Sequence, residues 1–135
     1  MKIFKIANKY NVIFDPKDGI GSVPWNQEVN YRGFVKKMTP DEFRSLVPKG
    51  NWDITSIERI KDAIKNGKGI GNPFLEVQWL DDIKKWQVID HEGRSRVDAM
   101  KEIGFNNIPV HIFPIRLRAR DLTDEMKNAE FIPQK

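Results

Sequence analysis

The chain has 135 residues, a net charge of +4 at pH 7, 39% hydrophobic residues and 31% charged residues. This length and balance predict a single globular domain over residues 1–135. No apolar run approaches the length of a membrane helix, so no membrane partner is expected. The chain contains no cysteine, which excludes disulfides and thiolate chemistry and suits a cytoplasmic protein. The modest positive charge permits a phosphate-bearing partner without requiring one.

The first fifty residues predict strands and a loop before a helix. Strand character covers residues 2–14, a Gly- and Pro-rich loop covers 15–27, and a short strand covers 31–38. A helix follows, because Thr39 at the N-cap and Glu42 three residues later form a capping box. A proline after its last apolar residue ends this helix.

The clearest helical pattern covers residues 55–67, where three isoleucines share one face. Its predicted start is a second capping box, made by Thr55 and Glu58, and Gly67 is its predicted C-cap. The sequence GKGIGNP that follows is glycine-rich, but its spacing does not fit a phosphate-binding P-loop. We therefore expect a flexible connector there.

The second half predicts a hairpin, a helix and a further strand. The hairpin strands cover 74–80 and 86–90, the helix covers 94–103 before Gly104, and the strand covers 108–115. A short last helix is expected, with Asp121 or Thr123 as its cap. This order of elements predicts a small α/β (α+β) domain, in which helices pack on a mixed β-sheet.

A charged corner at residues 90–96 joins the second hairpin strand to the next helix. A helix N-terminus exposes unpaired backbone N–H groups and a partial positive charge. Gly93 would let another group approach the backbone closely, and Arg94 and Arg96 would add cations where a helix tolerates them poorly. This combination suits a bound phosphate.

Two interpretations of the other polar residues at this corner stay open. In the first, Glu92 is a general base or a metal ligand beside a bound phosphate, Asp90 is its fallback, and His91 shuttles a proton. In the second, the two arginines pair with Asp90, Glu92 or Asp98, or Glu92 caps the helix. With two histidines and no cysteine, neither a zinc site nor a haem site is expected.

The stretch VIDHEGRSRVDAMKEIGFNNIPVHIF also carries a family resemblance. The order of elements is a strand, a Gly-containing corner with a terminal Arg, a helix that ends in Gly, and a Pro-containing strand. In chain order, the residues that match this pattern are Val88, Ile89, Gly93, Arg96, Ala99, Gly104, Ile108, Pro109 and Val110. Together with residues 73–77, these features resemble the ParB/sulfiredoxin superfamily over about residues 55–114. The HEGRSR form is similar to small ParB-like domains, many of them from phages and mobile elements. The N-terminal strands (1–50) and the extension (115–135) lie outside the resemblance.

The resemblance implies a domain whose corner, at Gly93, Arg94, Ser95 and Arg96, binds the phosphates of a nucleotide or nucleic acid, with Mg²⁺ carried by the nucleotide. Family activities include CTP binding and hydrolysis, ATP-dependent phosphoryl transfer and nuclease activity, and the fold does not choose among them. The sulfiredoxin branch is excluded because it uses a cysteine at the corner. The short extension is not expected to hold the helix-turn-helix domain of partition proteins. Arg94-Ser95-Arg96 replaces the doubled arginine of CTP-binding members, which leaves the nucleotide open.

Two further basic features could contact such a ligand. Lys68, in the glycine-rich connector, could reach the phosphate. Arg116, Arg118 and Arg120 would share one strand face, either as a nucleic-acid track or as a solvated edge that charge protects from aggregation.

The tryptophans divide by context. Trp79 and Trp86 are expected to pack in the hairpin, whereas Trp25 and Trp52, in loops, could stack on bases. His111 is expected on a strand face.

The sequence thus supports two functional hypotheses. The first is a ParB-like domain that acts on a nucleotide or nucleic acid, as a nuclease, a nucleotidase or a phosphotransferase. The rival is a non-catalytic phage-type factor that inhibits or redirects a host protein.

Overall fold

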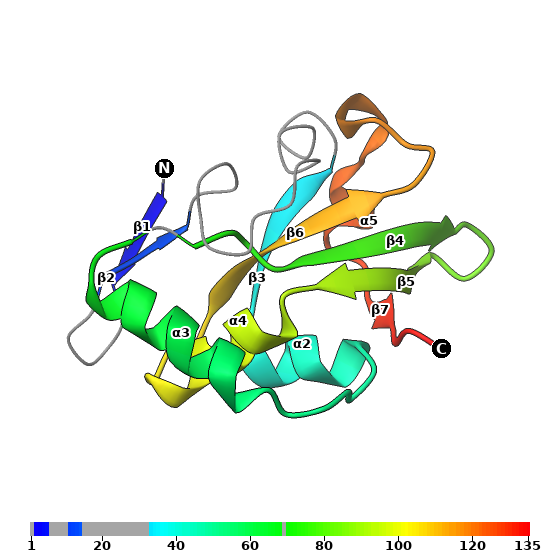
Figure 1. Ribbon diagram of the computed structural model, residues 1–135. Coiled ribbons are helices and arrows are strands. Elements are labelled where there is room, and N and C mark those ends of the chain that lie inside the picture. The colour runs from blue at the N-terminus through cyan, green and yellow to red at the C-terminus, as the bar shows by residue number, and fades with distance from the viewer. Residues whose placement is uncertain (1, 6–10, 15–32, 69) are drawn as a thin grey trace.

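The computed structural model describes residues 2–5, 11–14, 33–68 and 70–135 (Figure 1). The strands are β1 (Lys2–Lys5), β2 (Asn11–Phe14), β3 (Phe34–Met38), β4 (Phe74–Leu80), β5 (Lys85–Glu92), β6 (Ile108–Pro114) and β7 (Phe131–Ile132). The helices are α2 (Pro40–Leu46), α3 (Ile54–Lys65), α4 (Arg94–Glu102), the 3₁₀ turn η1 (Ala119–Asp121) and α5 (Asp124–Lys127). The predicted loop over 15–27 and Trp25 lie outside the described residues.

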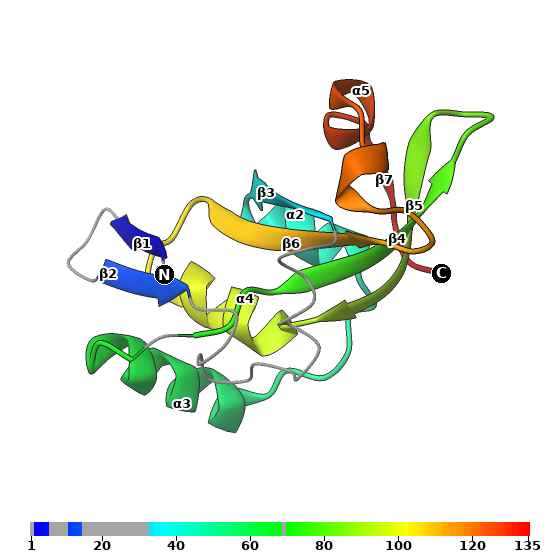
Figure 2. The ribbon, with the colours of Figure 1, turned by 90° about the horizontal axis from the view of Figure 1, so that it is seen from above.

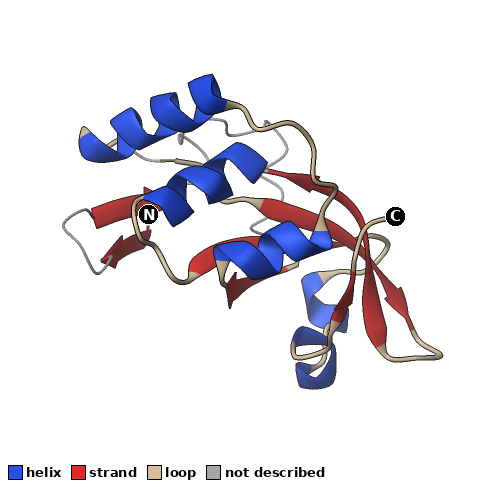
Figure 3. Cartoon of the chain, turned by 90° about the horizontal axis from the view of Figure 1, so that it is seen from below, coloured by secondary structure: helices blue, strands red, loops and turns tan. Residues whose placement is uncertain are grey.

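The main sheet is mixed, with the strand order β3-β6-β4-β5-β7. β6 runs parallel to β4 and β7 runs parallel to β5, whereas the other neighbours are antiparallel. Helices α2, α3 and α4 lie side by side on one face of this sheet, with α4 in the middle (Figures 1 and 3). β1 and β2 form a separate antiparallel pair. The predicted mixed sheet with helices packed on it is confirmed.

The hydrophobic core fills the space between the three helices and the sheet. Ile57 of α3, Met100 of α4 and Leu75 of β4 are fully buried there. Burying one such side chain contributes roughly 1.5–3 kcal/mol. The core therefore fixes α4, and with it the end of β5 that leads into α4.

The predicted capping box of α2 and the predicted hairpin are confirmed. The Glu42 N–H donates to Thr39 Oγ1 at 3.0 Å, and the Thr39 N–H donates to Glu42 Oε1 at 3.3 Å, which is the reciprocal capping box. In the hairpin, Trp79 and Trp86 face each other across the strands, with ring centroids 4.8 Å apart in an edge-to-face arrangement. Both tryptophans therefore serve packing, as expected.

The predicted capping box at Thr55 is wrong. The N-cap of α3 is Asp53, whose carboxylate accepts hydrogen bonds from the Ser56 N–H at 3.1 Å and from its hydroxyl at 2.8 Å. A carboxylate two residues earlier supplies a stronger acceptor than the hydroxyl, so the helix starts before Thr55. At the other end, Gly67 follows the C-cap in a left-handed conformation, which closes the helix as predicted.

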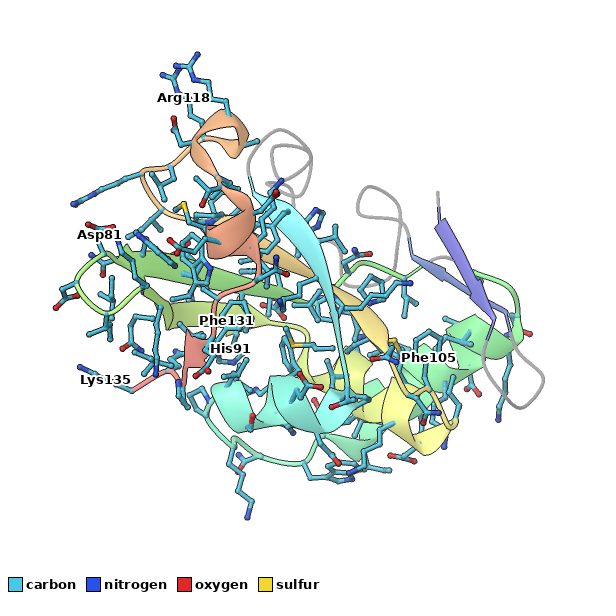
Figure 4. All side chains as sticks on the ribbon, turned by 180° about the vertical axis from the view of Figure 1, so that it is seen from behind. Asp81, His91, Phe105, Arg118, Phe131 and Lys135 are labelled. Atoms are coloured by element: carbon cyan, nitrogen blue, oxygen red, sulfur yellow. The ribbon has the colours of Figure 1, made fainter. Side chains whose placement is uncertain are left out.

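The predicted strand of alternating arginines is also wrong. β6 ends at Pro114, and Arg116 has a φ of 60°, which an extended strand cannot contain. The chain then forms η1, so Arg116, Arg118 and Arg120 lie exposed on a turn rather than on one strand face. Figure 4 shows Arg118 projecting from this turn, and Figure 2 shows η1 and α5 far from α3.

The predicted short last helix is confirmed as α5, with Thr123 as its cap, whereas the return of the chain to the sheet after this helix was not predicted. Thr123 caps α5 through a hydrogen bond from the Met126 N–H, and the buried Trp86 indole donates to the Met126 carbonyl at 2.7 Å. β7 then pairs with β5. This tail of the sequence therefore runs beside the strand that leads into the charged corner.

Candidate functional site

β5 continues two residues past its predicted end and contains a bulge just before the corner. Val88 pairs with Val77 and Asp90 pairs with Glu76, so Ile89 is an extra residue in β5. A bulge of this kind bends a strand and changes the direction of the side chains that follow. Asp90 to Glu92 are therefore strand residues with altered direction, rather than parts of a turn.

Gly93 makes the turn from β5 into α4. Its φ is 108°, and a Cβ at this position would lie 2.9 Å from the Pro73 Cα atom. Both facts demand glycine. The close approach that the sequence predicted is therefore made by Pro73 of the same chain.

The N-terminus of α4 lacks ordinary capping. Gly93 has no side chain that could accept a hydrogen bond, and the first turn contains no acidic residue. The first backbone bond within the helix is donated by the Val97 N–H to the Gly93 carbonyl. The N–H groups of Arg94, Ser95 and Arg96 precede it, and they carry the positive end of the helix dipole.

Arg96 is almost fully buried, with 4% of its surface exposed. Its guanidinium donates to the Asn72 carbonyl at 2.9 Å and lies 3.8 Å from Glu92 Oε1, a carboxylate that is half exposed. Burial lowers the pKa of the Arg96 guanidinium, and the charge of Glu92 offsets only part of this effect. Among the described residues, the Arg96 guanidinium thus donates to a neutral carbonyl and has the Glu92 carboxylate only at 3.8 Å, beyond hydrogen-bond distance, so its positive charge is incompletely neutralised there.

Arg94 points the other way and holds the loop between α2 and α3. It donates to the Pro48 carbonyl at 2.9 Å, and its guanidinium lies against Gly50. The predicted pairing of Arg94 or Arg96 with Asp98 does not occur, because Asp98 forms a two-pronged ion pair with Arg44 at 2.7 and 2.9 Å. The proposed pair of Glu92 with an arginine does occur, with Arg96 as its partner.

A cavity of about 250 Å³ lies where α3 packs beside α4. Its lining residues are Ser56, Arg59, Ile60, His91, Glu92, Gly93, Arg94, Ser95 and Arg96. All the corner residues predicted to bind phosphate thus line one cavity, together with two of the proposed catalytic residues. Three arginines and the Ser95 hydroxyl line this cavity with groups of the kind that bind an anion, whereas the Ser56 hydroxyl already donates to Asp53.

Sequence reasoning missed the contribution of α3. Ser56 and Arg59 lie three residues apart, which places them on the same side of the helix. Their spacing was visible, but only the packing of α3 against α4 shows that this side faces the corner. Lys68 lines a second groove along α3, which shares Arg59 with the corner cavity, and Lys68 is not among the residues that line that cavity.

The remaining candidates take ordinary structural positions. Asp90 accepts a hydrogen bond from the His91 N–H at 2.8 Å, and the buried His111 lies in β6, as expected. Trp52 is exposed on a groove between α2 and α4, not on the corner cavity.

Two whole-molecule features bear on cofactors and membranes. Among the described residues, no three His, Asp or Glu side chains come together as a metal site. In the same part of the chain, no helix has the length and apolar character needed to cross a bilayer.

Comparisons with known proteins add nothing to this geometry. No family model, no curated protein and no solved structure matches the chain.

Proposed function

We propose that the corner at the start of α4 binds the phosphate of a nucleotide or nucleic acid, in a ParB-like domain. The observation that carries this proposal is the buried, incompletely neutralised Arg96 on the wall of the cavity. A phosphate there would supply the missing negative charge.

The surroundings of Arg96 support a phosphate rather than a carboxylate or a small halide. The cavity is lined by side chains of Arg59, Arg94 and Arg96 and lies at the N-terminal N–H groups of α4. Phosphate has oxygens in several directions and can accept from such donors at the same time. The net charge of +4 favours an anionic ligand in the same sense.

The size of the cavity indicates which part of the ligand it can hold. Sites that enclose a whole small molecule are about 300–1,000 Å³. The cavity of about 250 Å³ suits one or two phosphate groups. We therefore propose that the sugar and base lie outside it and contribute less to affinity.

Catalysis at this site is the further part of the proposal. Glu92 and His91 line the same cavity and are within reach of a ligand there, whereas Asp90 does not line it. A nucleotide would carry its own Mg²⁺, for which one or two protein carboxylates suffice. Hydrolysis or phosphoryl transfer is then possible without a dedicated three-residue metal cage.

The experiment is a calorimetric titration with inorganic phosphate, nucleoside mono-, di- and triphosphates, and short DNA and RNA, each with and without Mg²⁺. Arg96→Met keeps the length and apolar stem of the side chain but removes its charge, so affinity should fall at least tenfold, since charge-assisted hydrogen bonds contribute about 1.5–3 kcal/mol. The matched control is Arg120→Met, which removes the same charge from an exposed residue on η1.

The two variants separate the possible results. Weaker binding in Arg96→Met with unchanged binding in Arg120→Met supports the corner site. Equal losses would mean that only net charge matters. No binding by the wild-type protein to any of these ligands contradicts the proposal and favours the rival, a protein that binds a host protein.

A further inference from the structure

The tail of the sequence is fastened along β5 by hydrogen bonds at several points. The Trp86 N–H donates to the Glu130 carbonyl at 2.9 Å, and the Gln87 amide donates to the Pro133 carbonyl at 2.9 Å. The Gln134 N–H then donates to the Leu46 carbonyl of α2, also at 2.9 Å. These bonds place the Gln134 side chain in a fixed position beside the end of β5 that contains His91.

The Gln134 side chain meets the His91 ring. The Nδ1 atom of His91 and the Oε1 atom of Gln134 are 2.7 Å apart. An amide oxygen can only accept a hydrogen bond, so a hydrogen bond at this contact requires the hydrogen on Nδ1. A neutral imidazole carries one N–H, and its Nε2 atom is therefore left with a lone pair.

We propose that Gln134 is a positioning residue that holds His91 in the Nδ1–H tautomer and so makes Nε2 a proton acceptor at the corner cavity. His91 is half-buried and lines that cavity. The role of the cavity ligand rests on the proposed function above. The tautomer itself does not, because it is a property of the protein without ligand.

The tautomer decides what His91 can do beside a bound phosphate. A neutral ring with the lone pair on Nε2 repels phosphate oxygens but accepts the proton of a hydroxyl or a water molecule. In that step the O–H bond breaks, an Nε2–H bond forms, and the oxygen keeps the electron pair to attack the phosphorus atom. As the new P–O bond forms, the bond from phosphorus to the leaving oxygen of the ligand breaks, and that oxygen departs with the electron pair of the broken bond. The Nδ1–H donor to Gln134 is present both before and after the transfer, so the tail stabilises the ring in both states.

His91 and Glu92 have different roles at the cavity. Glu92 lies 3.8 Å from the guanidinium of Arg96, so its carboxylate already has a cationic partner. His91 has instead a partner that fixes one ring nitrogen and leaves the other free to accept. We therefore assign the proton acceptor to His91 and the partial neutralisation of Arg96 to Glu92.

The test is nitrogen NMR of the histidine rings in the full chain without ligand, at a pH where both rings are neutral. The chain has only two histidines, so His91→Gln assigns the signals and the buried His111 serves as an internal control. The wild-type protein should show His91 mainly as the Nδ1–H tautomer. Gln134→Ala should shift it toward the Nε2–H form that predominates in free histidine, while the His111 signals stay in place.

Gln134→Glu provides the rescue, because a carboxylate also accepts from Nδ1–H and should restore the wild-type tautomer. Gln87→Ala is the matched control: it removes a different bond between the tail and β5 and should leave the His91 tautomer unchanged if the tail stays docked. A wild-type ring in the Nε2–H form, or no change in Gln134→Ala, overturns the assignment.

A parallel titration with inorganic phosphate separates this inference from the proposed function. Phosphate should shift the His91 ring signals in the wild-type protein and in Gln134→Ala, since binding depends on Arg96. A correct tautomer without any phosphate binding would contradict the proposed function and the ligand role of His91, but not the role of Gln134. Phosphate binding with the wrong tautomer would contradict only the inference.

Discussion

Helices α2 and α4 lie in the same layer, yet their N-termini are built in opposite ways. At α2, Thr39 and Glu42 satisfy backbone N–H groups, and acidic residues occupy the first turn. At α4, a glycine supplies no cap, and arginines occupy the first turn. Local interactions stabilise the first arrangement and oppose the second.

The difference shows that α4 is held at its start by contacts from distant parts of the chain. Gly93 packs on Pro73, Arg96 donates to Asn72, and Arg94 fastens the loop at Pro48. A natural sequence that gives up local stabilisation at one such place marks a candidate functional site. The predictions that follow test whether the start of α4 is structural, anion-binding or both.

The largest expected effect on stability comes from Gly93→Ala. The positive φ and the contact with the Pro73 backbone together should lower the free energy of unfolding by roughly 2–4 kcal/mol. Gly67→Ala is the matched control, because Gly67 also has a positive φ but no atom lies within 4 Å of its Cβ position. It should cost only about 1 kcal/mol. Urea unfolding measures both, and equal losses would show that the contact with Pro73 is unimportant.

The second prediction removes the ordinary cap of α2, which makes its start resemble that of α4. Thr39→Ala should lower the free energy of unfolding by about 1 kcal/mol. The same change at Thr55, which is exposed inside the first turn of α3, should stay within about 0.5 kcal/mol. A larger loss at Thr55 than at Thr39 in thermal unfolding would contradict the capping scheme.

The third prediction gives α4 the acidic first turn that it lacks. Ser95→Asp should raise the free energy of unfolding by about 0.5 kcal/mol, because a carboxylate favours a helix N-terminus. The same charge should repel a bound phosphate and lower its affinity at least tenfold. Ser95→Asn is the neutral control. If Ser95→Asp binds phosphate as tightly as Ser95→Asn, the cavity is not where the anion binds.

The smallest effect concerns pH at the start of α3. Hydrogen bonds from the Ser56 N–H and hydroxyl lower the pKa of the Asp53 carboxyl, with little opposition from burial. Since the folded pKa is the lower one, this contribution is complete at neutral pH and is lost as pH falls below about 4. Asp53→Asn, which keeps a capping side chain, should lose less stability on acidification than the wild-type protein. Parallel acid unfolding curves would contradict this.

The local parts of the fold were predictable because their signals lie within a few residues. The capping box at Thr39 and the tryptophan pair of the hairpin are of this kind. Where two local signals overlap, the prediction was wrong. Asp53 and Thr55 could each cap α3, and the carboxylate of Asp53 determines where the helix starts. The alternation of arginines after β6 resembles a strand, but the left-handed backbone of Arg116 breaks it.

The part of the candidate site that is continuous in the sequence was predictable, whereas the contributions from distant segments were not. The residues from His91 to Arg96 follow one another in sequence and line one cavity. The contribution of Arg59 depends on how α3 packs, and the bond between His91 and Gln134 joins residues 43 positions apart. Neither has a local signal. The opposite directions of Arg94 and Arg96 depend likewise on distant partners, the Pro48 and Asn72 carbonyls.

The most direct test of the central claim compares the helix starts in one experiment. Inorganic phosphate is titrated into the full chain while backbone amide NMR signals are recorded. The amides of Ser95, Arg96 and Val97 should shift with saturation, whereas those of Asp41 and Glu42 at the capped start of α2 should not. Shifts that are equal at both helix starts, or absent at α4, would contradict an anion site at this corner.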